Sequence, residues 1–125
     1  MFKVEIKEQS KELSKREQLK VKDVSAAIKL DEATKEGPIE IVPVGYVVLA
    51  VHNDKAQDRP DYENYMVLDN AGDCYVTGST AFFNGFMEIF STMGPAGEEE
   101  EYKIKVFRKP SKNYTNKDFI TCTII

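Results

Sequence analysis

The alternation of apolar and polar residues predicts a chain built mainly from β-strands. Residues 2–6 alternate strictly between apolar and charged side chains, which is typical of a strand with one buried face. Residues 39–52 form a long run rich in β-branched residues. Pro43 and Gly45 interrupt this run, so we expect an edge, a bulge or a bend there. Further strands are predicted at residues 64–69, 74–77, 102–107 and 119–125.

One segment has the periodicity of a helix instead. Gly78 and Ser79 end a strand and offer a helix N-cap. In residues 81–93 large apolar side chains recur at spacings of three and four, which places them on one helical face. Gly94 and Pro95 then end the helix. The pattern predicts one amphipathic helix between the third and fourth strands counted from residue 39.

This order of elements is that of a five-stranded OB-fold barrel with one α-helix between strands three and four. We therefore predict a mainly β chain with an OB-fold domain at residues 37–125. Residues 1–36 are predicted to form an N-terminal arm or additional strands that pack on the barrel, within a single globular domain. Residues 10–20 are compatible with a solvated helical turn or a flexible arm, and residues 21–30 with a strand or a helix.

Length and composition agree with one domain and exclude several classes of protein. The chain has 125 residues, of which 42% are hydrophobic, enough for a core without metal or disulfide cross-links. It contains no apolar run of the about 18 residues that a membrane span requires, and it does not begin with the apolar stretch of a signal peptide. We therefore expect a cytoplasmic protein that does not associate with membranes, with Cys74 and Cys122 buried and reduced.

The histidine and the acidic residues do not support catalysis or metal binding. His52 is the only histidine, at the end of a predicted strand. Asp54, Asp58, Asp61 and Glu63 lie in a polar loop without the alternating spacing of a calcium-binding loop. The sequence also lacks a glycine-rich phosphate loop and a nucleophile elbow. We predict a protein that is not an enzyme and that binds no cofactor and no metal.

Basic residues are concentrated in one segment of an acidic chain. The formal net charge is -4. Residues 102–117 nevertheless contain six basic residues and no acidic residue, whereas residues 37–101 contain two basic and twelve acidic residues. A local cluster can bind phosphates in a chain of negative net charge. This segment is therefore the best candidate for a functional site.

The strand predicted at residues 102–107 divides this segment into two rows of side chains. Its apolar members would face the core, and Lys103, Lys105 and Phe107 would face the solvent. The loop that follows connects strands four and five, and this loop of OB folds commonly binds oligonucleotides. Single strands require cations along the phosphates and aromatic rings that stack on bases. The candidate DNA-binding residues are Lys103, Lys105, Phe107, Arg108, Lys109, Lys112, Tyr114 and Lys117, with Tyr65 and Tyr75 on the neighbouring strands.

Two structural alternatives stay open at this point. The basic segment is also compatible with a solvated hairpin whose charges serve solubility. Tyr65 and Tyr75 are also compatible with inward packing, which would leave only their hydroxyl groups at the rim.

Several stretches resemble a known family. They are residues 75–84 (YVTGSTAFFN), 109–114 (KPSKNY), 117–122 (KDFITC) and 27–31 (AIKLD). These stretches resemble small single-stranded DNA-binding proteins of bacteriophages and conjugative elements in Gram-positive bacteria. The resemblance spans most of the chain. It implies an OB fold, binding of single-stranded DNA without strong sequence preference, and a role in phage or plasmid replication, recombination or transfer inside the bacterial host cell.

We therefore predict a single-stranded DNA-binding protein, whose expected partners include host or phage replication and recombination proteins. The alternative is a protein-interaction module, for example a phage factor that docks on a host replication protein. The acidic middle of the chain and the long N-terminal arm favour that alternative. The apolar run at residues 39–48, with its edge broken at Pro43, is also compatible with a homodimer.

Overall fold

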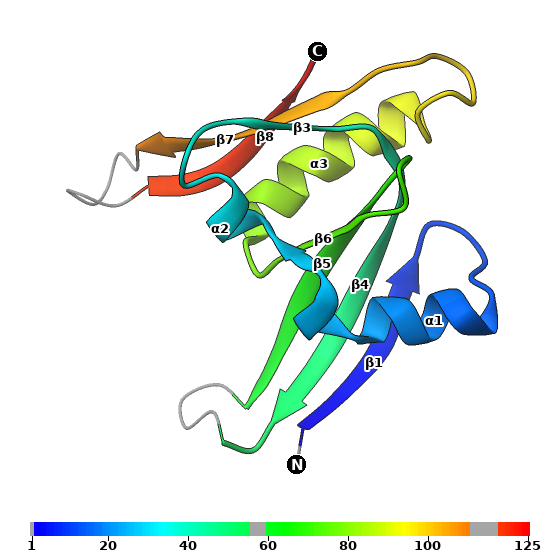
Figure 1. Cartoon of the computed structure of the whole chain (residues 1–125), viewed down its shortest axis with the longest axis vertical. Helices are drawn as coiled ribbons and strands as arrows, with labels where there is room; N and C mark the ends of the chain where they lie inside the picture. Colours follow the sequence, from blue (N-terminus) through cyan, green and yellow to red (C-terminus); the bar gives the residue numbers. More distant parts are fainter. Residues whose placement is uncertain (1, 56–59, 111–117) are drawn as a thin grey trace.

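Two β-sheets account for most of the regular structure in the computed structural model, which describes residues 2–55, 60–110 and 118–125 (Figure 1). One sheet has the order β1–β4–β5–β6–β2, with β1 at Phe2–Gln9, β4 at Pro43–Asn53, β5 at Asp61–Asp69, β6 at Cys74–Thr77 and β2 at Ile28–Lys29. The other has the order β3–β7–β8, with β3 at Ile39–Ile41, β7 at Ile104–Pro110 and β8 at Asp118–Ile124. The helices are α1 (Lys15–Lys22), the 3-10 helix η1 (Val24–Ala26), α2 (Leu30–Ala33) and α3 (Thr80–Met93).

The mainly β prediction is confirmed, and α3 lies between β6 and β7 in the chain as expected. Among the described strands, however, no ladder joins the two sheets, so they do not close into the five-stranded barrel that we expected. The reason lies beside β6. Closure would require β8 there, but β6 pairs in parallel with β2, with Ile28 opposite Tyr75. The N-terminal segment thus occupies an edge that a closed barrel would use.

The long apolar run bends near Pro43, as the sequence predicted. Residues 39–41 pair with β7 in the three-stranded sheet, and β4 pairs with β5 in the five-stranded sheet. The register shifts between Pro43 and Gly45, and the backbone N–H of Val42 donates to a carboxylate oxygen of Asp69 at 2.9 Å. Bends of this kind let one run of chain pass from one sheet to another.

The N-terminal segment is ordered over both ranges that the sequence left open. Residues 10–20 contain the start of α1, where Ser14 and Glu17 form a reciprocal capping box with bonds of 3.1 and 3.0 Å. Such a cap satisfies two backbone donors and explains why the helix begins there. Residues 21–30 form η1 and the short β2. Part of this segment is thus helical, and β1 adds an antiparallel edge strand to β4.

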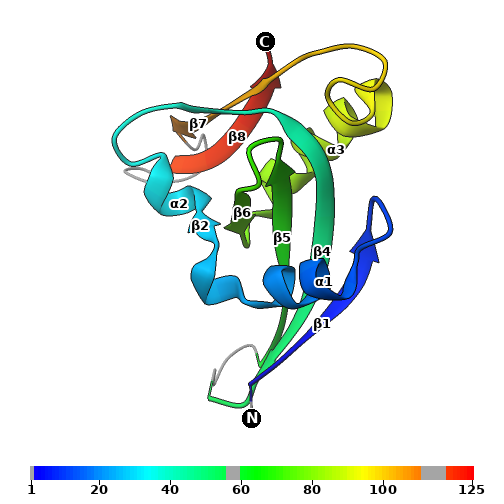
Figure 2. The ribbon, with the colours of Figure 1, turned by 45° about the vertical axis from the view of Figure 1, so that its right-hand side comes forward.

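Hydrophobic clusters cover both faces of the five-stranded sheet. On one face Tyr46 and Val48 pack with Phe86 of α3 and with residues of the three-stranded sheet. On the other face β4 and β5 pack against Leu13 and Val21 of the N-terminal segment. Figure 2 shows α1 crossing this second face. Central strands buried on both sides are typically continuous apolar runs, as residues 46–51 are.

The predicted helix over residues 81–93 is confirmed as α3. Ser79 caps its start, since its hydroxyl accepts from the N–H of Phe82 at 3.1 Å. Gly94 ends it with a φ of +71°, a left-handed conformation that glycine adopts readily. Within the described residues, every helix is too short or too polar to cross a lipid bilayer.

Candidate nucleic-acid interface

The outer face of the three-stranded sheet gathers several of the basic and aromatic side chains predicted from the sequence. Along β7 burial alternates as expected. Ile104 and Val106 are fully buried, whereas Lys105 is exposed and Phe107 is half-buried. Successive side chains of a strand point to opposite faces of its sheet. Lys105, Phe107 and Lys109 therefore form one outward row.

Strand β8 adds a second row to this face. The antiparallel register places Lys109 opposite Phe119, which is 38% exposed. Directly opposed residues share a face, with Cβ atoms roughly 4.5–5.5 Å apart. We call the resulting surface the basic–aromatic face, and its members are Lys105, Phe107, Lys109, Phe119, Thr121 and Thr123, with the exposed Glu40 of β3 opposite Lys105 at its edge. It presents two ammonium groups and two phenyl rings on one side of the sheet.

The charges on this face differ in how far they are neutralised. The Nζ atom of Lys105 lies 5.7 Å from the ring centroid of Phe107, within the range of a cation–π contact. Lys109 is exposed and makes no salt bridge with any described residue. Lys103 pairs with Glu40 of β3 at 3.3 Å, and exposed pairs of this kind are weak. Lys105 and Lys109 are thus the cations most open to a phosphate.

Arg108 lies on the opposite side of the sheet from these lysines. It is opposite the buried Ile120 in the register, and its guanidinium faces α2. Its Nε donates to Thr34 Oγ1 at 3.2 Å, its Nη1 to the Asp118 carboxylate at 3.0 Å, and its Nη2 to the carbonyl oxygen of Asp31. The structure therefore separates Arg108 from the basic–aromatic face and gives it internal partners, unlike the phosphate contact that we expected.

Tyr65 and Tyr75 pack inward, which is the second of the two alternatives that the sequence left open. Tyr65 is 6% exposed, and its ring stacks on Phe83 with centroids 4.3 Å apart. Tyr75 is half-buried against the same cluster. Burial raises the pKa of both phenol groups. Tyr65 offers no open ring to a base, and the half-buried Tyr75 packs on the inner cluster instead of the basic–aromatic face, so we leave both out of the interface.

The face of β5 and β6 that OB folds commonly use for ligands is covered here. Its side chains include Met66 and Val76, which are aliphatic and 0% and 4% exposed. Leu13 and Val21, from the segment around α1, pack against them. Aliphatic side chains lack the π face that stacks on a base. This face therefore serves as a second core and not as a nucleic-acid platform.

Three predicted site residues lie outside the described residues. Lys112, Tyr114 and Lys117 belong to residues 111–117, between β7 and β8. Their part in the site stays a prediction from the sequence.

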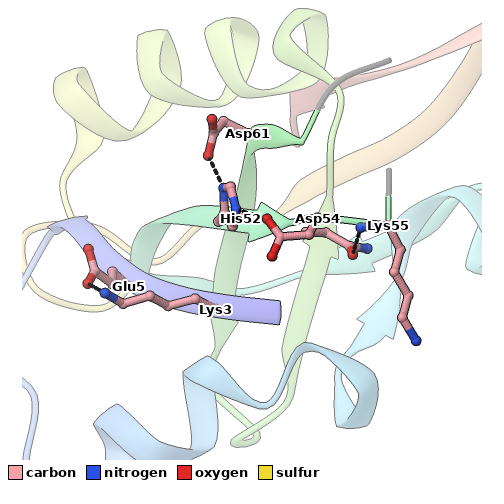
Figure 3. A network of polar contacts seen from close by, with 7 residues as sticks. Lys3, Glu5, His52, Asp54, Lys55 and Asp61 are labelled. Atoms are coloured by element: carbon pink, nitrogen blue, oxygen red, sulfur yellow. Dashed lines mark hydrogen bonds and ion pairs between the residues drawn. The ribbon is translucent and has the colours of Figure 1, made fainter. Parts of the chain in front are cut away.

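The β4–β5 end of the five-stranded sheet holds a separate polar network (Figure 3). The Nδ1 atom of His52 lies 2.6 Å from Asp61, and its Nε2 atom contacts Asp54. The bond to Asp61, followed by the bond to Asp54, raises the pKa of His52. Lys3 lies opposite His52 in the register and pairs with Glu5 at 2.9 Å. No group of three or more potential metal ligands is found in the ranges that the structure describes.

The two cysteines are free thiols, as expected, but both are half-buried instead of fully buried. Burial raises the pKa of Cys122 to about 11 and also raises that of Cys74. Thiols with raised pKa values hold little thiolate at neutral pH and react slowly. The cysteines therefore contribute packing and no evident chemistry.

Phe119 is the site residue that the reasoning from sequence missed. The strand at residues 119–125 was predicted, but its two faces were not separated. Ile120 is 2% exposed, so the odd-numbered positions Phe119, Thr121 and Thr123 point outward. The alternation of Thr121 and Thr123 with apolar residues was the available signal.

Comparison of this chain with protein-family models, with curated proteins and with solved structures finds no match.

Proposed function

We propose that this chain binds single-stranded DNA, largely without sequence preference, through the basic–aromatic face. One observation supports the proposal above all others. Two lysine ammonium groups alternate with two phenyl rings on one open sheet face, at Lys105, Phe107, Lys109 and Phe119. The four side chains come from two adjacent strands whose other face is buried in the core.

The chemistry of these groups matches what a single strand offers. Ammonium groups bind phosphates and release counterions, which gives affinity that does not depend on sequence. Phenyl rings stack on bases, and each stacked base contributes roughly 1–3 kcal/mol. Because every base has a π face, stacking tolerates any sequence. A net charge of -4 for the whole chain limits long-range attraction but leaves these local contacts available.

The order of elements supports an open relative of the OB fold as the architecture. The order β4, β5, β6, α3, β7, β8 corresponds to the five strands and the helix of that fold. The bend at residue 42 gives the first strand a part in both sheets. The proposed interface differs from the usual one because α1 covers the face of β5 and β6. It lies instead on β7 and β8, beside residues 111–117, which contribute Lys112, Tyr114 and Lys117 in sequence.

The resemblance to phage and conjugative-element proteins supplies the biological setting of the proposal. Stretches such as residues 75–84 and 117–122 carry that resemblance. We propose on this basis that the protein protects or presents single strands during replication, recombination or transfer of a mobile element in a bacterial cytoplasm.

Fluorescence anisotropy with labelled oligo-dT at low salt tests the proposal. We expect binding whose affinity falls with salt, with a slope of about -0.7 per phosphate contact, and little preference between oligo-dT and oligo-dA. Phe119→Ala and Lys109→Ala should each weaken binding by about five- to tenfold or more. Lys55→Ala is the matched control, since Lys55 is exposed at the β4–β5 end of the molecule.

Absence of binding at low salt would overturn the proposal. Binding that Lys55→Ala weakens and Phe119→Ala leaves unchanged would instead move the interface to the β4–β5 loop. Tighter binding to duplex than to single strands would also contradict it, because paired bases cannot stack on exposed rings.

A further inference from the structure

Leu19 is an apolar side chain exposed in the middle of a basic helix surface. It lies on α1 and is 72% exposed. Three basic residues surround it on the same side of the helix, because they lie three or four positions away: Lys15, Arg16 and Lys22. Among the large hydrophobic side chains that the structure describes, Leu19 is the most exposed.

The helix is held so that this side faces outward. Val21, on the opposite side of α1, is 2% exposed and packs on the five-stranded sheet. The Nζ atom of Lys20 donates to the carbonyl oxygen of Gly72 at 2.7 Å. Lys15, Arg16 and Lys22 make no salt bridge with any residue that the structure describes. The basic side of α1 is therefore presented in a fixed orientation with its charges available.

An acidic groove of complementary character lies elsewhere on the molecule. It has a volume of about 650 Å³ and includes apolar surface from Val42, Ala96 and Ile125. Glu40, Glu101 and Lys103 line it as well, and Lys103 pairs with Glu40 at 3.3 Å, so the acidic character comes from Glu101 and the glutamates beside it. The exposed residues 98–100, all glutamates, precede Glu101 in the connection from α3 to β7. The groove thus combines an apolar lining with the acidic residues 98–101 at its border.

We propose that α1 of one copy docks into this acidic groove of a second copy, with Leu19 beside Ile125 and the basic rim facing residues 98–101. Charge complementarity and the match of an apolar side chain to an apolar lining support a second copy as the occupant. The helix lies on the five-stranded sheet, whereas the groove is formed by β3, the end of β8 and the α3–β7 connection (Figures 1 and 2).

Such a contact is heterologous and leaves one free helix and one free groove on each pair. Copies of the chain therefore add in a row instead of closing into a symmetric dimer. The groove is lined by Glu40 and Lys103 at the edge of the basic–aromatic face but by none of Lys105, Phe107, Lys109 and Phe119, so each copy in the row keeps these four side chains open. The inference stands apart from the proposed function, because self-association can be measured without nucleic acid.

Two variants, each altered at one end of the contact, test the proposal. The helix variant combines Arg16→Glu with Leu19→Gln, and the groove variant combines Glu99→Lys with Glu101→Lys. In sedimentation velocity at low salt the wild-type chain should associate with rising concentration and dissociate as salt rises. Each variant alone should associate about tenfold or more weakly. Mixed in equal amounts, they should form a dimer that does not grow, through the intact groove of one and the intact helix of the other.

All substituted residues are exposed, so circular dichroism melts should match the wild type. Lys55→Glu is the control for a change of charge alone and should associate normally. A wild-type chain that stays monomeric at low salt overturns the proposal, as does a mixture that stays monomeric or a variant that associates like the wild type. If the helix variant instead loses affinity for an oligonucleotide too short for two copies, the α1 surface binds nucleic acid and the proposal is wrong.

Discussion

The two sheets of this protein each have an outward face, and the two faces differ in nearly every respect. The face of the five-stranded sheet is aliphatic, with Leu49 and Met66 at 0% exposure under the α1 segment. The face of the three-stranded sheet carries lysines, phenylalanines and threonines and stays open. The same strand geometry underlies both. What differs is whether another element covers the outward side chains.

The difference indicates which sheet face remains available for a ligand in this fold. Side chains on a sheet face that a helix covers contribute to the core and cannot contact a ligand. The opposite sheet is free to present polar and aromatic groups because its inner face alone supplies the core. The position of α1 is therefore the reason why we propose the interface on the three-stranded sheet and not on the five-stranded one.

The largest expected effect is on stability, from a cavity in the packing between the five-stranded sheet and the α1 segment. Leu49→Ala removes a fully buried side chain between β4 and the α1 segment. We expect a loss of about 2–5 kcal/mol in the free energy of unfolding, measured by urea denaturation, because a cavity remains. Affinity for oligo-dT should not change while the variant is folded. A loss of less than about 1 kcal/mol would mean that α1 covers this face only loosely.

A smaller effect on stability is expected at the join between α2 and the three-stranded sheet. Arg108→Ala removes three hydrogen bonds, to Thr34, Asp118 and the Asp31 carbonyl. The expected loss in the free energy of unfolding is about 1–3 kcal/mol, since each bond contributes modestly and the site is partly exposed. The slope of affinity against salt should stay unchanged. A slope reduced by one phosphate contact would show that Arg108 binds the backbone of DNA after all.

A substitution that keeps apolar area but removes the aromatic ring tests whether the basic–aromatic face stacks on bases. Phe119→Leu should weaken binding of oligo-dT by about 1 kcal/mol, roughly fivefold, with little change in stability. Fluorescence anisotropy measures the first quantity and thermal melting the second. Equal affinities of Phe119→Leu and the wild type would indicate hydrophobic contact without stacking.

The smallest expected effect concerns the polar network at the other end of the five-stranded sheet. The contacts with Asp61 and Asp54 raise the pKa of His52 above its ordinary value of 6.5. These contacts therefore add stability below the ordinary pKa, and the contribution is lost as pH rises through the raised one. Proton NMR titration should show the raised midpoint, and Asp61→Asn should lower it. DNA binding should follow no titration of His52, because His52 is remote from the basic–aromatic face.

The sequence predicted individual elements well and their assembly poorly. The helix at 81–93 and a strand near 102–107 follow from local spacing and alternation, but the strand runs from Ile104 to Pro110, so Arg108 and Lys109 belong to it and not to the loop that we predicted. The missing closure of the barrel depends on β2, a two-residue strand whose pairing with β6 spans distant parts of the chain. Two residues carry no periodic signal, so no local pattern could have predicted that pairing.

The same limit explains the outcome at the candidate site. Lys105 and Phe107 follow from alternation within one strand, and the structure confirms their outward positions. Arg108 was predicted in the loop after the strand, but β7 continues to Pro110 and its alternation puts Arg108 on the inner side, opposite Ile120. The inward position of Tyr65 depends on its stacking with Phe83, and no local pattern in the sequence indicates that tertiary contact.

The bonds from Arg108 also affect the order in which the chain can fold. Two of them join positions separated by 77 and 74 residues, from α2 and the residue after it to β7. Contacts of such large sequence separation form late, because the loop between their partners must close first. On a ribosome, α2 emerges long before β7 is made. The strands β1 and β2 can already pair with β4 and β6 at that stage, whereas the bonds from Arg108 to Asp31 and Thr34 form only once β7 has been made, and fragments that end before residue 104 should lack them.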